Sequence, residues 1–92
     1  MIKRFSHKGL RDFFDTGRVG GINPAHAGKL KLILAMLKNA KKPEDMRKPN
    51  LKLHTLQGNL AGFFAVSVSG NLRVIFRFEG QDITDVDYLD YH

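Results

Sequence analysis

The chain has 92 residues, no Cys, and 15 Lys and Arg against 9 Asp and Glu, which gives a net charge of +6. This length predicts one domain over residues 1–92 and excludes a multidomain enzyme, while the lack of Cys excludes disulfides and Cys-based zinc sites. The longest apolar run, residues 32–37, is far short of the roughly 20 residues of a membrane span, and no secretory signal is present, so we expect a cytoplasmic domain.

The N-terminal part of the chain predicts a short strand and a helix. Residues 2–5 are the candidate strand, and Ser6 is positioned to cap the helix that follows. Three apolar residues at the i, i+3, i+4 spacing of one helix face support that helix: Leu10, Phe13 and Phe14. Gly17 is expected to end it.

A second helix is predicted after the loop. Asn23 and Pro24 read as its N-cap and first helical position. Its apolar stripe has the spacing i, i+3, i+4, i+7 and consists of Leu30, Ile33, Leu34 and Leu37. Pro43 marks the limit of the helix, and a basic loop follows it.

The C-terminal part predicts an antiparallel three-stranded meander, because the apolar period changes to two after Asn50. Matching the apolar faces favours three-residue loops over 69–71 and 80–82. The resulting pairs are Val68 with Leu72, Val66 with Val74, Phe64 with Phe76, Arg77 with Asp85, and Arg73 with Leu89. The helices cover the apolar face, so the fold class is α+β.

Charge is distributed unevenly along the chain. Residues 1–78 hold all 15 basic and four acidic residues, a net charge of +11, whereas residues 79–92 hold five acidic residues and no Lys or Arg. The basic part suggests a polyanionic partner, most simply nucleic acid, although a merely solubilising surface has the same composition. The acidic strand is expected to face arginines across the sheet.

Several side chains suit the cleavage of RNA through its own 2′-hydroxyl. That reaction needs a base, an acid and a cation for the phosphate, which imidazole and guanidinium supply. The candidates are Lys52, His54, Arg73, Asp90, Tyr91 and His92. The same atoms could instead form a zinc site from His54, Asp90 and His92. His7 and His26 read as surface residues with nothing nearby to orient their rings.

Four segments together resemble the HigB toxins of the RelE-like superfamily of type II toxin–antitoxin systems. They are residues 1–10, Lys52-Leu53-His54-Thr55-Leu56-Gln57-Gly58, Asn71-Leu72-Arg73-Val74-Ile75-Phe76 and Asp87-Tyr88-Leu89-Asp90-Tyr91-His92. The resemblance extends over the whole chain and implies a RelE-like microbial ribonuclease fold. It implies a metal-independent, ribosome-dependent endoribonuclease without cofactor, which cleaves mRNA in the ribosomal A site and thereby inhibits translation and growth.

The resemblance also implies partners and site residues. The partners are a HigA-type helix-turn-helix antitoxin, the 70S ribosome with its mRNA, and operator DNA bound only through the toxin–antitoxin complex. The implied catalytic residues are His54, Asp90, Tyr91 and His92, and the implied substrate-binding residues are Arg73, Asn71, Lys52 and Gln57. Gln57 departs from the Lys that family members can carry there, so it supplies no cation. A non-catalytic nucleic-acid-binding module in a repressor complex is the alternative that the basic composition leaves open.

Overall fold

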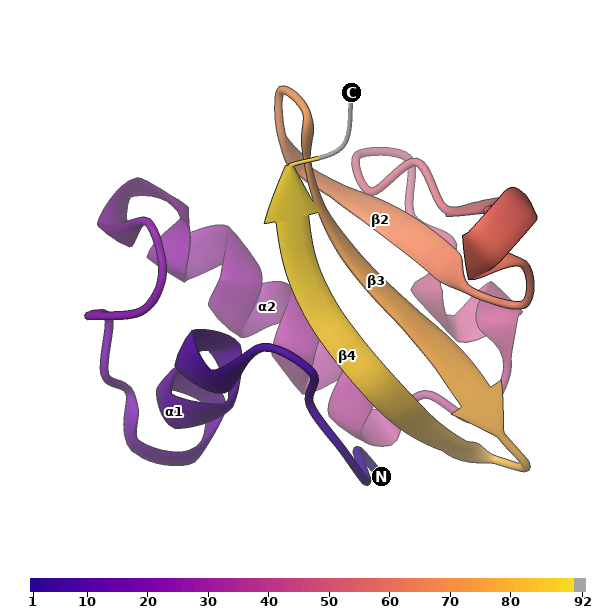
Figure 1. Cartoon of the computed structure of the whole chain (residues 1–92), viewed down its shortest axis with the longest axis horizontal. Helices are drawn as coiled ribbons and strands as arrows, with labels where there is room; N and C mark the ends of the chain where they lie inside the picture. Colours follow the sequence, from indigo (N-terminus) through magenta and orange to yellow (C-terminus); the bar gives the residue numbers. More distant parts are fainter. Residues whose placement is uncertain (91–92) are drawn as a thin grey trace.

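The computed structural model describes residues 1–90, which form two helices packed on one face of an antiparallel sheet (Figure 1). The helices are α1 (Lys8–Thr16) and α2 (Ala27–Asn39), with short 3-10 turns at Pro24–His26, Pro43–Met46 and Gly58–Leu60. The strands are β1 (His54–Thr55), β2 (Phe64–Ser69), β3 (Leu72–Glu79) and β4 (Asp82–Asp90), in the order β1-β2-β3-β4. The α+β prediction is confirmed, and β1 adds an edge strand to the predicted three-stranded meander.

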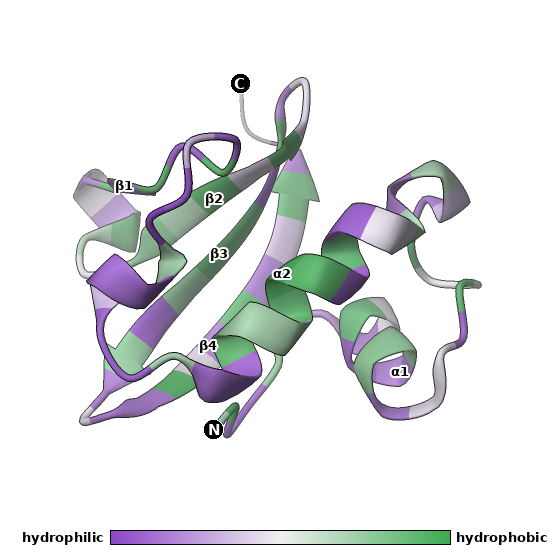
Figure 2. Cartoon of the chain, turned by 180° about the vertical axis from the view of Figure 1, so that it is seen from behind, coloured by the Kyte–Doolittle hydropathy of each residue, from purple (hydrophilic) through white to green (hydrophobic). Residues whose placement is uncertain are grey.

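The main core lies between the helices and the sheet. All four residues of the predicted α2 stripe are buried there, and they meet Val66, Val74 and Phe76 of the sheet. Figure 2 shows α2 lying across this face of the sheet. No helix within residues 1–90 is long and apolar enough to cross a membrane.

The opposite face of the sheet is not uniformly polar, which corrects the prediction of a single apolar face. Ala65 and Ile75 are buried on it together with Leu56, and Leu60, Phe63 and Leu89 pack around them. We call Leu56, Ala65 and Ile75 the small cluster. It holds the segment after β1 against the sheet, and it therefore fixes the position of β1 at the sheet edge.

Both hairpin turns contain two residues, Gly70–Asn71 and Gly80–Gln81, so the predicted three-residue loops are wrong. A bulge follows each turn and shifts the register by one residue. The predicted pairs beyond the bulges are therefore confirmed: Phe64 with Phe76, Val66 with Val74, and Arg73 with Leu89. The pairs before the bulges are wrong, because Leu72 pairs with Ser69 and Arg77 pairs with Thr84.

The N-terminal segment does not form the predicted strand. Ile2 and Phe5 make isolated parallel bridges to Ile83 and Val86 of β4. A continuous ladder is interrupted there because β4 bulges at Asp85, whose φ is 53°. The α1 boundaries also differ from expectation, since His7 rather than Ser6 is the N-cap and its Nδ1 accepts the Leu10 N–H at 3.0 Å. Gly17 ends α1 in the left-handed conformation, as predicted.

Asp85 ties the N-terminal segment to the sheet. Arg77 Nε donates to its carboxylate at 2.6 Å, and Arg4 Nη1 forms a second ion pair with it. The hydrogen bond from Arg77 is the largest influence lowering the pKa of Asp85; burial opposes it, and Arg4 lowers the pKa further. The folded chain therefore binds a proton at Asp85 less readily than the unfolded chain does.

The ionised carboxylate of Asp85 should consequently add to the free energy of unfolding at neutral pH. This contribution should be lost in acid. The stabilisation is complete above the unfolded pKa of about 4 and decreases as pH falls through the folded pKa. We expect Asp85→Asn to unfold at lower urea concentration at about pH 6, with the difference from the parent shrinking towards about pH 3. Asn tolerates the left-handed backbone, so the comparison isolates the charge. A difference that stays constant over this range would contradict the role of the ion pairs.

The first turn of α1 packs directly on the backbone of the following loop. A Cβ added at Gly9 would lie 2.7 Å from the carbonyl carbon of Gly21 and even closer to its oxygen. Gly28 occupies the corresponding second position of α2, and a Cβ there would meet nothing within 4 Å. Backbone atoms cannot move aside as a flexible side chain can, so Gly9 is required by this close approach.

Gly9→Ala and Gly28→Ala should therefore change stability in opposite directions. Overpacking at Gly9 is expected to cost about 1–3 kcal/mol, more than the roughly 1 kcal/mol that Ala contributes over Gly in a helix. Gly28→Ala should raise stability by about 0.5–1 kcal/mol. Urea unfolding of both variants measures this. A stabilised Gly9→Ala variant would show that α1 does not pack on Gly21.

Candidate active site

The sheet places His54 and Arg73 on the same face. His54 pairs with Ala65, which pairs with Ile75, and Arg73 stands two residues before Ile75 on β3. Directly paired residues and alternate residues share a face, so both side chains emerge on the face away from the helices. Two ladder spacings, or about 10 Å, separate their strands. A polyanion lying over this face could contact both residues.

Arg73 is held by backbone carbonyls of the β2–β3 turn. Its Nη1 donates to the carbonyl oxygen of Gly70 at 2.7 Å and to that of Leu72 at 3.2 Å. Its Nε is buried and has no hydrogen-bond partner among residues 1–90. A buried N–H without an acceptor costs about 1–3 kcal/mol.

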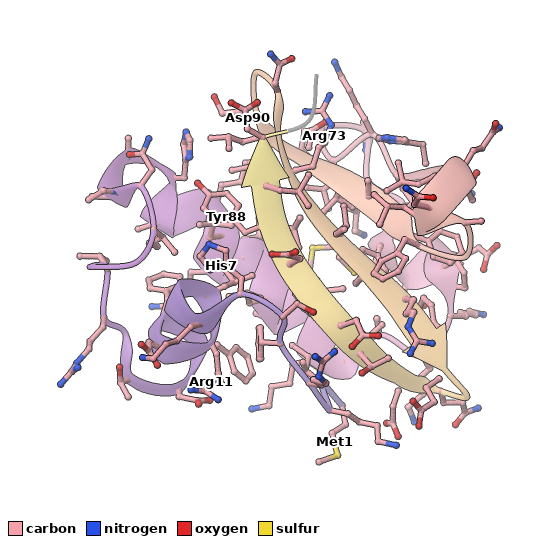
Figure 3. All side chains as sticks on the ribbon, viewed as in Figure 1. Met1, His7, Arg11, Arg73, Tyr88 and Asp90 are labelled. Carbon is pink, nitrogen blue, oxygen red and sulfur yellow. The ribbon has the colours of Figure 1, made fainter. Side chains whose placement is uncertain are left out.

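Two further predicted residues lie beside Arg73. Asp90 on β4 pairs with Leu72, the residue before Arg73 on β3. Figure 3 shows Arg73 and Asp90 at the same end of the sheet. Asn71 is exposed in the two-residue turn next to them. Asn71, Arg73 and Asp90 therefore lie at one end of the sheet, although Asp90 shares the face of its partner Leu72 and not that of Arg73. Tyr91 and His92, which follow Asp90, lie outside the described residues.

The remaining predicted residues lie towards the other edge of the sheet, on or next to β1. Lys52, His54 and Gln57 are all exposed. His54 Nδ1 lies 2.9 Å from the carbonyl oxygen of Lys52. The segment is anchored at Leu56, whose N–H donates to the Phe63 carbonyl at 3.0 Å and whose side chain belongs to the small cluster. The predicted residues within residues 1–90 thus form two groups. Lys52, His54 and Gln57 lie at the β1 edge, and Asn71, Arg73 and Asp90 lie at one end of β3 and β4.

Asp87, in the acidic strand that was expected to face arginines, is a neighbour of the site that was not among its predicted residues. It pairs with Ile75 and so lies in the same ladder row and on the same face as His54. Its Oδ1 accepts the N–H of Tyr88 at 2.8 Å. Asp87 therefore adds a carboxylate to this face on β4, on the side of Arg73 that is away from His54.

His7 and His26 are not the unoriented surface residues that we expected. His26 Nδ1 lies 2.8 Å from the Tyr88 hydroxyl, and the His7 ring packs edge-on against Tyr88 at 5.6 Å between centroids. Burial raises the pKa of the Tyr88 hydroxyl, while a hydrogen bond to the Asn23 backbone opposes this. These contacts lie on the helical side and join α1, the following loop and β4.

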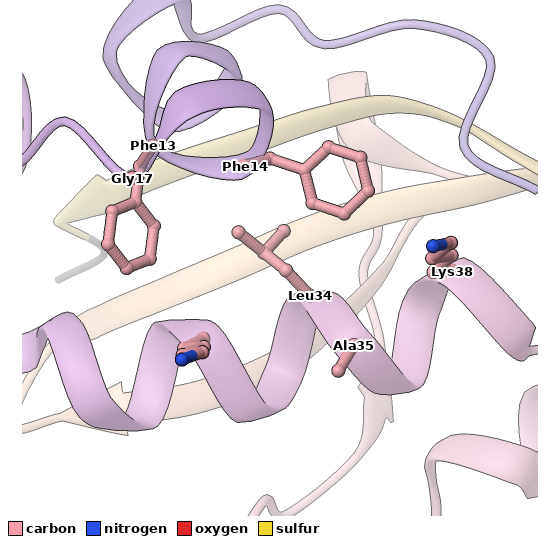
Figure 4. Close-up of a pocket in the computed structure, with 7 residues that line it drawn as sticks. Phe13, Phe14, Gly17, Leu34, Ala35 and Lys38 are labelled. Carbon is pink, nitrogen blue, oxygen red and sulfur yellow. The ribbon is translucent and has the colours of Figure 1, made fainter.

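A groove lies between α1 and α2 (Figure 4), and none of the predicted site residues lines it. Its volume is about 450 Å³, and it is lined by Phe13, Phe14, Gly17, Lys31, Leu34, Ala35 and Lys38. The lining includes no carboxylate or imidazole, and its ionisable side chains are Lys31 and Lys38. Within residues 1–90, no three His, Asp or Glu side chains lie close enough to hold a metal ion, and the predicted zinc ligand His92 falls outside that range.

Comparisons with known proteins agree with the fold. The chain is 32% identical to Endoribonuclease HigB of Proteus vulgaris over 92 residues, which is the full length of both chains. The crystal structure of a copper-bound mutant toxin from Helicobacter pylori has a TM-score of 0.56 at 18% identity, covering 98% of this chain and 94% of that one. The solution structure of a conserved hypothetical protein from the same organism has a TM-score of 0.52 at 15% identity, covering 95% and 90%.

The TM-scores show that the two solved structures share the fold of this chain. Sequence identities this low show the fold alone. Membership of a family rests on the sequence. A sequence model described as a RelE-like toxin of the type II toxin–antitoxin system HigB matches residues 3–92, nearly the whole chain. With the full-length similarity to the Proteus vulgaris protein, this match shows that the chain belongs to the HigB-like family of type II toxin–antitoxin toxins.

Proposed function

We propose that this toxin is a ribosome-dependent endoribonuclease that cuts mRNA in the ribosomal A site without a metal ion. The name of the Proteus vulgaris relative supports the activity. The observation that carries the proposal is Arg73, whose partly exposed guanidinium is fixed at the sheet end by the Gly70 carbonyl. A phosphate oxygen is the acceptor that best matches this guanidinium in charge and geometry.

The proposed reaction uses the 2′-hydroxyl of the mRNA as nucleophile. A base takes the proton of that hydroxyl, the 2′-oxygen bonds to phosphorus, and the bond from phosphorus to the 5′-oxygen breaks. An acid gives its proton to the leaving 5′-oxygen. The products are a 2′,3′-cyclic phosphate and a 5′-hydroxyl. His54 or His92 exchanges these protons, and Asp90 orients or charges one of the two rings.

The other residues of the site bind the RNA in this proposal. Arg73 holds the scissile phosphate, and Lys52 before β1 adds a second cation, since Gln57 after β1 is uncharged. Tyr91 stacks on or positions the nucleotide, and Asn71 in the turn contacts a base. On the face away from α1 and α2, His54 is exposed and Arg73 is partly exposed, beside the small cluster and the segment that packs on it, so both side chains are accessible to such a strand.

The proposed partners follow from the toxin family and the charge of the chain. A HigA-type antitoxin neutralises the toxin, and the complex of the two binds operator DNA. The basic part of the chain, residues 1–78, binds ribosomal RNA in the cytoplasm. Affinity for ribosomes should then fall steeply as salt increases.

A reconstituted translation reaction with a defined mRNA tests the proposal. We expect the purified toxin to cut the mRNA only when ribosomes are present, and to leave a cyclic phosphate at the upstream end. Equal cutting of free mRNA would contradict ribosome dependence. A toxin that binds ribosomes but produces no cuts would instead support the non-catalytic alternative.

A further inference from the structure

His54 makes one hydrogen bond that determines which of its nitrogens is free to react. Its Nδ1 lies 2.9 Å from the carbonyl oxygen of Lys52. A carbonyl oxygen only accepts hydrogen bonds, so Nδ1 must carry the proton in this contact. The bond survives protonation of the ring, since the imidazolium also donates from Nδ1. Proton exchange is therefore confined to Nε2.

The backbone of Lys52 is what brings its carbonyl to His54. Lys52 has a φ of 52°, in the left-handed region, which costs a non-glycine residue about 1–2 kcal/mol. The chain is fixed on both sides of it. Leu51 is buried in the main core and its carbonyl accepts the Ser67 N–H at 2.7 Å, while Leu53 packs against the same core. Burial of these two leucines holds the backbone of Lys52 in the left-handed conformation.

We infer that Lys52 is a positioning residue, whose left-handed backbone holds its carbonyl on His54 Nδ1 and makes Nε2 the nitrogen that exchanges a proton with RNA. The part of this inference that concerns proton exchange with RNA rests on the proposed function. Its structural content stands on the Lys52–His54 contact alone, so the two can be tested separately.

The chain contains its own reference for this assignment. His7 Nδ1 accepts the N–H of Leu10 at 3.0 Å, so neutral His7 must carry its proton on Nε2. His54 and His7 are thus expected to be opposite tautomers in one molecule. A solvent-exposed imidazole without a partner favours the Nε2–H form, which is the form excluded at His54.

Long-range ¹H–¹⁵N correlation spectra of the full chain, labelled at histidine, distinguish the two forms. At a pH where both rings are neutral, we expect protonated Nδ1 at His54 and protonated Nε2 at His7. A protonated Nε2 at neutral His54 would overturn the inference. This outcome does not depend on ribosomes or RNA, so it is separate from any failure of the proposed activity.

Two substitutions of Lys52 then separate its backbone from its charge. Lys52→Asn and Lys52→Val both remove the ammonium group, but Asn tolerates the left-handed region and the β-branched Val does not. We expect Lys52→Asn to keep protonated Nδ1 at His54 and Lys52→Val to shift towards protonated Nε2. Cleavage of ribosome-bound mRNA should be at least about tenfold slower for Lys52→Val than for Lys52→Asn, the fall expected when a positioned proton-transfer group is misplaced.

The two readouts together decide between the claims. Amide spectra confirm that each variant is folded before either readout is taken, and Lys52→Gly replaces Lys52→Asn as the permissive variant if Asn fails to fold. Equal tautomers and equal rates for the permissive variant and Lys52→Val would overturn the positioning role. The expected tautomers with no cleavage by the parent chain would uphold the geometry and contradict the proposed function.

Discussion

Arg73→Ala is expected to slow cleavage of ribosome-bound mRNA by about 100- to 1,000-fold, the loss typical of removing one preorganised donor to a developing negative charge. The guanidinium is already fixed by the carbonyls of Gly70 and Leu72, so little reorganisation is needed when phosphate binds. Arg73→Lys keeps the charge but lacks the planar fork and the buried Nε, so it should recover only part of the rate. Single-turnover cleavage on preassembled ribosomes measures this.

Arg77→Ala is the matched control for Arg73→Ala. Arg77 is on the same strand, but its guanidinium is engaged by a carboxylate, because its Nε donates to Asp85 at 2.6 Å. We expect Arg77→Ala to lower the urea midpoint while keeping cleavage within about threefold of the parent, as for a charge outside the site. Equal loss of cleavage in the two variants would show that Arg73 acts through general surface charge, and would contradict a phosphate contact.

His54→Ala should lower the cleavage rate by about 100- to 10,000-fold, the range for removing a group that transfers a proton in the transition state. His54 is exposed and lies in the short strand β1, so the fold should tolerate the change. His26→Ala provides the control on the helical side, where it removes the contact with Tyr88. Growth arrest on induction gives the same comparison in cells.

An active His54→Ala variant would contradict the role of His54 in proton transfer. If His54→Ala arrests growth as the parent does, and its single-turnover rate is unchanged, His54 is not a proton-transfer group. The assignment of Nε2 as the reacting nitrogen would then lose its catalytic meaning, although the hydrogen bond to Lys52 would remain.

The amphipathic patterns of the helices and strands were sufficient to predict most of the architecture. The α2 stripe, the left-handed end of α1 at Gly17, and the pairs Val66–Val74 and Arg73–Leu89 were all predictable, because burial of one face determines register strongly. The bulges were not predictable. A two-residue turn plus a bulge gives the same pairs further along the strands as a three-residue turn.

Placement of the candidate site was predictable only in part. Alternation within the strands placed Arg73 on the face away from the helices, where Leu89 and Asp87 are its neighbours. The left-handed conformation of Lys52 has no local signal, since it is imposed by burial of Leu51 and Leu53 on either side. The contacts of His7 and His26 with Tyr88 join residues far apart in the chain, so spacing could not reveal them.

The central claim is that RNA is cut through its own 2′-hydroxyl by groups of this chain. The most direct test is an mRNA with a single 2′-deoxynucleotide immediately upstream of the mapped cleavage position, loaded on ribosomes with the purified toxin. We predict that cutting at that position disappears, while the matched all-ribose mRNA is cut to a 2′,3′-cyclic phosphate. Continued cutting of the deoxy-substituted position would mean that water is the nucleophile, and would contradict the account.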